Sequence, residues 1–69
     1  MKAFASEIYA AVRGGRLKEP FTADTARRAC PGWADATYRV FFNKHRVGNP
    51  GGTTELFVRV APGRFKLTN

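Results

Sequence analysis

Two residue types that often act as nucleophile or base occur once each in this chain of 69 residues. They are Cys30 and His45, and a nucleophilic pair would require contact between them. Cys30 stands among alanines, where a small buried thiol is the ordinary reason for a cysteine. His45 continues an aromatic stripe, which favours a histidine at the edge of the core over a general base. Neither residue predicts nucleophilic catalysis.

The acidic residues do not form a catalytic or metal-binding pattern either. There are five, spread along the chain: Glu7, Glu19, Asp24, Asp35 and Glu55. A single cysteine excludes an intrachain disulfide and a cysteine-rich zinc site, and it fits a reducing, cytoplasmic setting. The glycine-rich stretch at 48–52 lacks the lysine and the following helix of a phosphate-binding loop. We therefore expect no enzyme activity, no metal and no cofactor.

A second set of residues has the chemistry for contacts to base pairs. It consists of Thr37, Arg39, Asn43 and Arg46, of which the last three fall on one side of a helix. Arginine can form two hydrogen bonds to guanine and asparagine two to adenine, while threonine can contact a phosphate or a thymine methyl. A solvated helix face would use the same residue types. The set alone does not decide between these two interpretations.

The distribution of charge favours a polyanionic partner. The net charge is +7, and residues 1–24 hold four basic and three acidic residues. Residues 25–69 hold eight basic and two acidic residues, so the positive field belongs to this part. Beyond the set above, we expect these basic residues to contact phosphates: Arg27, Arg28, Lys44, Arg59, Arg64 and Lys66. A charge that serves only solubility stays open, and no long amphipathic helix suggests a membrane surface.

Two helices are predicted before residue 31. Apolar residues on one face define the first, from 2 to 13: Phe4, Ile8, Ala11 and Val12. Gly14 and Gly15 end it, because glycine adopts the left-handed cap conformation at little cost. The second helix, from 23 to about 30, follows Thr22, a residue type suited to the N-cap.

A third helix is predicted from 36 to about 47, with Asp35 as its N-cap. Its apolar stripe has the spacing i, i+3, i+4, i+7 and consists of Tyr38, Phe41, Phe42 and His45. Trp33, in the turn before this helix, is interpreted as a core anchor, with base stacking as the alternative. Arg39, Asn43 and Arg46, proposed above for base contacts, lie opposite the stripe.

After a loop predicted at 48–54, residues 56–67 are expected to form a β-hairpin. Ala61 to Arg64 has proline and glycine where a type II turn needs them. In that register the apolar face starts from Leu56 and has two opposed pairs, Val58 with Leu67 and Val60 with Phe65. The other face pairs Arg59 with Lys66, beside Phe57. Two like charges in direct opposition repel, which favours an anion bound between them.

These elements predict one α+β domain over residues 1–69, a three-helix core with a C-terminal two-stranded hairpin. In order and spacing the chain resembles the winged helix-turn-helix superfamily. Two segments carry the likeness, Ala-Thr-Tyr-Arg at 36–39 and Pro-Gly-Arg-Phe-Lys-Leu at 62–67. The resemblance implies a recognition helix at about 36–47 in the major groove and a basic wing at about 56–67 on the DNA backbone.

The sequence therefore predicts a non-catalytic protein or module that binds double-stranded DNA. RNA is less expected, because a stacking platform needs exposed aromatic residues and only Phe57 is predicted to face outward on the hairpin. The alternative is a winged helix that joins protein subunits, its own copies or a larger complex. An exposed third-helix face dominated by Val40 and Val47, instead of one continuous positive surface, would favour that alternative.

Overall fold

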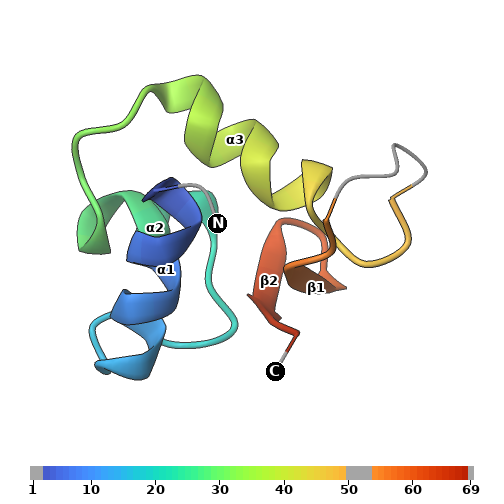
Figure 1. Ribbon diagram of the computed structural model, residues 1–69, viewed down its shortest axis with the longest axis horizontal. Coiled ribbons are helices and arrows are strands. Elements are labelled where there is room, and N and C mark those ends of the chain that lie inside the picture. The colour runs from blue at the N-terminus through green and yellow to red at the C-terminus, as the bar shows by residue number, and fades with distance from the viewer. Residues whose placement is uncertain (1–2, 50–53, 69) are drawn as a thin grey trace.

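The computed structural model describes residues 3–49 and 54–68. Within these ranges three helices precede a two-stranded antiparallel sheet: α1 (Ala3–Arg13), α2 (Ala23–Ala29), α3 (Asp35–Lys44), β1 (Phe57–Ala61) and β2 (Arg64–Leu67) (Figure 1). The helices lie around one side of the hairpin, with α3 running across the top of the view toward it. This α+β arrangement is the one predicted, and its layout is that of a winged helix.

The first helix buries the face predicted for it. Phe4 and Ile8 are almost completely inaccessible to solvent, and Ala5 and Ala11 beside them are fully buried. Burying such side chains contributes about 1.5–3 kcal/mol each for the larger ones. The helix ends at the glycine pair: the N–H of Gly14 donates to the carbonyl of Ala10, and Gly15 has a φ of 81°. Lys2, the predicted first residue, lies outside the described residues.

The N-terminus of α2 is held by the predicted cap. The backbone N–H of Thr25 donates to the Thr22 hydroxyl at 3.2 Å, and the backbone N–H of Thr22 donates to the Thr25 hydroxyl at 2.9 Å. This reciprocal pair satisfies two backbone donors at the helix start, a stabilisation of about 1 kcal/mol. Ala26, on the inner face of α2, is fully buried.

The third helix has other bounds than predicted. Its N-cap is Ala34, which makes no side-chain cap, and Asp35 is the first helical residue. An acidic residue in the first turn still favours the helix dipole. The helix ends at Lys44 and not near 47, because the backbone of His45 is used by the hairpin: its carbonyl accepts from the N–H groups of Leu56 and Phe57 at 2.7 and 3.1 Å. The prediction of both helix ends was therefore wrong.

The hairpin register also differs from the predicted one. Phe57 pairs with Leu67, Val58 with Lys66, Arg59 with Phe65 and Ala61 with Arg64. The register shifts between Arg59 and Ala61, so Val60 is an extra residue on β1 and every residue before it changes face. Phe57 is consequently buried and Val60 is 46% exposed, the reverse of the prediction. The predicted opposition of Arg59 and Lys66 was wrong. Of the loop predicted at 48–54, residues 50–53 lie outside the described residues.

A short backbone contact ties the α1–α2 connection to the hairpin. The N–H of Phe21 donates to the carbonyl of Phe65 at 2.8 Å, and the N–H of Phe65 donates back at 2.9 Å. Both side chains enter an aromatic core with Phe42, whose ring centroid lies 5.1 Å from that of Phe21 and 5.6 Å from that of Phe65. Phe57 packs edge-on against Phe42 at 5.1 Å. This core fixes the position of α3 relative to the hairpin.

Candidate nucleic-acid interface

The outer face of α3 carries three of the four residues predicted to contact bases, Thr37, Arg39 and Asn43, together with Lys44. Arg39, Asn43 and Lys44 are exposed, and Thr37 is half-buried. The opposite side of the helix is closed against the core by Tyr38, Phe41 and Phe42, each less than 10% exposed. The predicted division of this helix into an apolar and a polar face is thus confirmed at these positions. An exposed α-helix is an element that the major groove of DNA can accept.

Arg46 does not belong to this helical face. It lies beyond the end of α3, is half-buried, and forms an isolated parallel bridge with Phe57. Its backbone N–H donates to the carbonyl of Asn43 at 3.4 Å. The helical spacing that grouped Arg46 with Arg39 therefore does not apply, and Arg46 is attached to the start of the hairpin.

The centre of the α3 face is apolar. Val40 is 56% exposed, and Val47, just after the helix, is 48% exposed. A shallow hollow of about 290 Å³ lies next to Val40 and is bordered by Thr37, Phe41 and Lys44. The face therefore has a valine at its centre and cationic or amide side chains around it. This surface therefore combines features of the continuous positive surface expected for DNA binding and of the valine-dominated face expected for protein contact.

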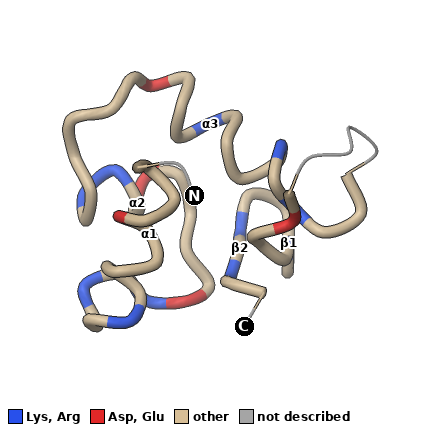
Figure 2. Tube along the Cα trace, in the orientation of Figure 1, with Lys and Arg blue, Asp and Glu red and all other residues tan. Residues whose placement is uncertain are grey.

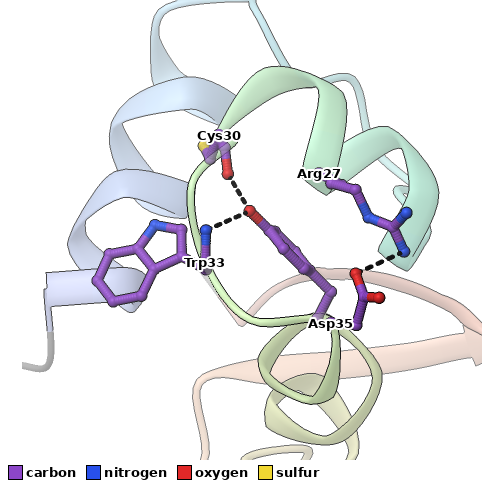
Figure 3. Close-up of polar contacts among 5 residues, drawn as sticks. Arg27, Cys30, Trp33 and Asp35 are labelled. Carbon is purple, nitrogen blue, oxygen red and sulfur yellow. Dashed lines mark hydrogen bonds and ion pairs between the residues drawn. The ribbon is translucent and has the colours of Figure 1, made fainter.

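The two arginines of α2 have different surroundings. The guanidinium of Arg27 lies 3.6 Å from a carboxylate oxygen of Asp35 and 5.6 Å from the centroid of the Tyr38 ring (Figure 3). It connects α2 with the start of α3. Arg28 instead lines a groove with Arg16 and Lys18 on the α1–α2 connection. Arg27 and Arg28, which were both predicted to contact the DNA backbone, therefore lie in two different surroundings.

Tyr38 fixes the turn between α2 and α3. Its hydroxyl donates to the carbonyl of Cys30 at 2.6 Å and accepts from the backbone N–H of Trp33 at 3.2 Å (Figure 3). Trp33 packs against Phe4, with the ring centroids 5.4 Å apart, and its indole N–H donates to Glu7 at 2.7 Å. The interpretation of Trp33 as a core anchor is confirmed. These contacts determine how α3 projects from the helical core.

The hairpin adds exposed cations on a different element. Arg64 and Lys66 alternate with the buried Phe65 and Leu67, so both lie on the outer face of β2. Arg59 is also exposed, although it lies opposite Phe65 and not opposite Lys66. Repulsion between Arg59 and Lys66 therefore no longer supports an anion bound between them. Arg59, Arg64 and Lys66 are nevertheless all exposed.

His45 and Cys30 both have structural surroundings. The His45 ring is 7% exposed, stacks at 4.4 Å on Phe41, and its Nδ1 bonds the carbonyl of Thr54 at 2.8 Å. Its Nε2 has no partner among the described residues. The Cys30 thiol donates to the carbonyl of Glu7 at 3.6 Å, and burial raises the pKa of this thiol. The prediction that His45 lies at the edge of the core is confirmed.

The positive charge of the molecule is not confined to one face. Figure 2 shows basic residues on α3 and on the hairpin, and a further group around the α1–α2 connection and α2. Of this last group the sequence analysis had singled out Arg27 and Arg28 but missed the cations of the connection, because the charges of residues 1–24 nearly cancel when they are summed. The Gly-Gly-Arg-Leu-Lys segment at 14–18 was the available signal, since a turn places its cations on the surface.

In the part of the chain that the structure describes, no three His, Cys, Asp or Glu side chains come together as a metal site. No described helix has the length and apolar character needed to cross a membrane. Comparison with protein-family models, curated proteins and solved structures gives no match.

Proposed function

We propose that this domain binds double-stranded DNA without catalysing a reaction on it. In this proposal α3 enters the major groove, and Arg59, Arg64 and Lys66 of the hairpin contact the phosphate backbone. Arg46, at the junction of the two elements, contributes a further phosphate contact. A rigid helix face beside a basic hairpin suits a DNA groove and the phosphate backbone that flanks it.

The exposed face of α3 is the observation that carries the proposal. Arg39 and Asn43 are types that form paired hydrogen bonds to guanine and adenine, and both are exposed on a helix whose other side is buried. Val40 between them suits apolar contact with a thymine methyl. The helix is held rigidly by the aromatic core and by Tyr38, so the free energy of binding is not spent on ordering it.

A protein-interaction module is the second candidate, and the exposed valines favour it. Val40 and Val47 would bury apolar surface against a partner, and the hollow next to Val40 could accept one of its side chains. The positive charges around them would then meet an acidic partner. The two candidates differ in their dependence on salt and on duplex DNA.

The deciding experiment is a salt titration of binding to a random-sequence duplex, measured by fluorescence anisotropy. For the four phosphate contacts proposed above on a duplex of about 20 base pairs, the slope of log K against log salt is expected to be about −4. Backbone NMR shifts in the complex should map to 37–46 and 59–66. Absence of binding at about 50 mM salt would exclude DNA as the ligand of this face and favour the protein partner.

A further inference from the structure

A groove on the other side of the molecule has the features of an anion site. It has a volume of about 450 Å³ and lies between the α1–α2 connection and α2. Three cationic residues from these two segments line it: Arg16, Lys18 and Arg28. No acidic residue lines it among residues 3–49 and 54–68. The start of the α1–α2 connection, just after α1, lies at the end of the molecule away from α3, whereas its later part runs up toward α3 (Figure 1).

The nearest acidic side chain in the sequence is turned away from this groove. Glu19 follows Lys18, but its carboxylate accepts a hydrogen bond from the backbone N–H of Leu67 at 2.6 Å. It therefore serves β2 and leaves the charge of Lys18 uncompensated. Arg27, beside Arg28, is the arginine that pairs with Asp35. The carboxylates of Glu19 and Asp35 are thus engaged away from the groove.

One of the three cations is already fixed in place. The guanidinium of Arg16 donates to the carbonyl of Ala29 at 3.3 Å, at the last residue of α2. Arg16 also borders a second hollow that includes Glu7. Arg16 therefore has a structural explanation in its bond to the helix end, whereas Lys18 and Arg28 are exposed and form no ion pair with described residues. These two are the groups that a ligand would engage.

We propose that this groove binds the phosphodiester backbone of a second duplex, so that one copy of the domain holds two duplexes. The inference rests on the proposed function, because it assigns the first duplex to α3 and the hairpin. The groove offers arginine and lysine but no asparagine or glutamine, a set that suits phosphates and not base edges. A duplex that lies along α3 leaves the start of the α1–α2 connection, with Arg16 and Lys18, open to a second duplex.

Arg28→Gln and Arg13→Gln form a matched pair for the test. Both arginines are exposed and lie in the last turn of a helix, and each substitution removes one positive charge. Only Arg28 lines the groove; the guanidinium of Arg13 lies 5.3 Å from the centroid of the Tyr9 ring. A difference between the two variants therefore reports on the groove and not on net charge.

The experiment measures capture of a fluorescent duplex by an immobilised duplex, each of about 20 base pairs, in the presence of the protein at about 50 mM salt. Anisotropy with a single duplex is measured in parallel. Arg28→Gln is expected to reduce capture about tenfold, since a charge-assisted contact is lost, and to leave the single-duplex Kd within about twofold. Arg13→Gln is expected to leave both within about twofold of the parent protein.

Two results would overturn the inference while the proposed function stands. One is single-duplex binding by the unmodified protein without capture of the second duplex. The other is equal capture by the Arg28→Gln and Arg13→Gln variants, which would assign bridging to dimerisation or to net charge. Failure of the unmodified protein to bind even one duplex contradicts the proposed function itself, and the inference falls with it.

Discussion

At the scale of single residues, the sequence does not reveal which hydrogen-bond partners the buried polar groups have. The periodicity of the third helix predicted that Tyr38 is apolar and buried, but it could not indicate that the hydroxyl reaches Cys30 and Trp33. Nor did the sequence indicate that Glu7 accepts the indole N–H of Trp33. Such partners depend on how elements distant in the sequence pack, whereas burial itself follows from local periodicity.

Tyr38→Phe tests the importance of the turn between α2 and α3. The substitution keeps the ring but leaves the Cys30 carbonyl and the Trp33 N–H without their partner. We expect the free energy of unfolding to fall by about 1–3 kcal/mol, the cost of leaving buried polar groups unsatisfied. Urea denaturation of the two proteins measures it. Tyr9→Phe, which removes a longer bond to the Leu56 carbonyl at 3.2 Å, serves as the control and should cost less.

The buried thiol of Cys30 gives a stability that depends on pH. Burial raises the pKa of Cys30 in the folded protein above its value in the unfolded chain, and the Glu7 carboxylate adds to this effect. The unfolded chain therefore loses the thiol proton first, at about pH 8.5. Stability is complete below that pH and falls as the pH rises through the folded-state pKa. Cys30→Ala should lack this alkaline decline in urea denaturation; an identical decline in both proteins would contradict the assignment.

At the scale of elements, order and type were predictable from the sequence, and boundaries and register were not. The glycine pair at 14 and 15 and the cap at Thr22 are local signals, and both hold. The end of α3 depends on His45 receiving hydrogen bonds from residues that are more than ten positions away. The hairpin register depends on the extra residue at Val60, which no turn rule predicts from Pro62 and Gly63.

Phe57→Ala distinguishes the observed register from the predicted one. Phe57 is fully buried against Phe42, so its truncation should reduce the free energy of unfolding by about 3–5 kcal/mol. Val60→Ala, at a position 46% exposed, should cost less than about 1 kcal/mol. The predicted register requires the opposite order, with Val60 in the core. Thermal and urea unfolding of the two variants settle the comparison.

At the scale of the whole molecule, the cationic residues of this short chain lie in separate regions of the surface. The longest extent of the molecule is 29 Å, and the aromatic core occupies the space between α3 and the hairpin. The summed charge of the sequence predicted an anionic partner, but only the fold separates the cations of α3 and the hairpin from those of the groove at Lys18 and Arg28.

Arg39→Ala tests whether α3 carries the duplex contact. Arg39 is exposed opposite the buried stripe, so the substitution should leave the free energy of unfolding within about 0.5 kcal/mol of the parent value. Loss of a bidentate contact to a base or of a phosphate contact should weaken duplex binding by about 1–3 kcal/mol. The salt dependence separates the two origins. A lost phosphate contact lowers the slope of log K against log salt by about one, whereas a lost base contact leaves the slope unchanged.

Arg13→Ala is the matched control for this measurement, because it removes the same charge from an exposed helical position on a different element. Its effect on binding gives the contribution of net charge alone, which is small at an exposed site in moderate salt. If Arg39→Ala weakens binding no more than Arg13→Ala, then α3 does not lie against the duplex. The exposed Val40 and Val47 would in that case identify the face as one that meets another protein.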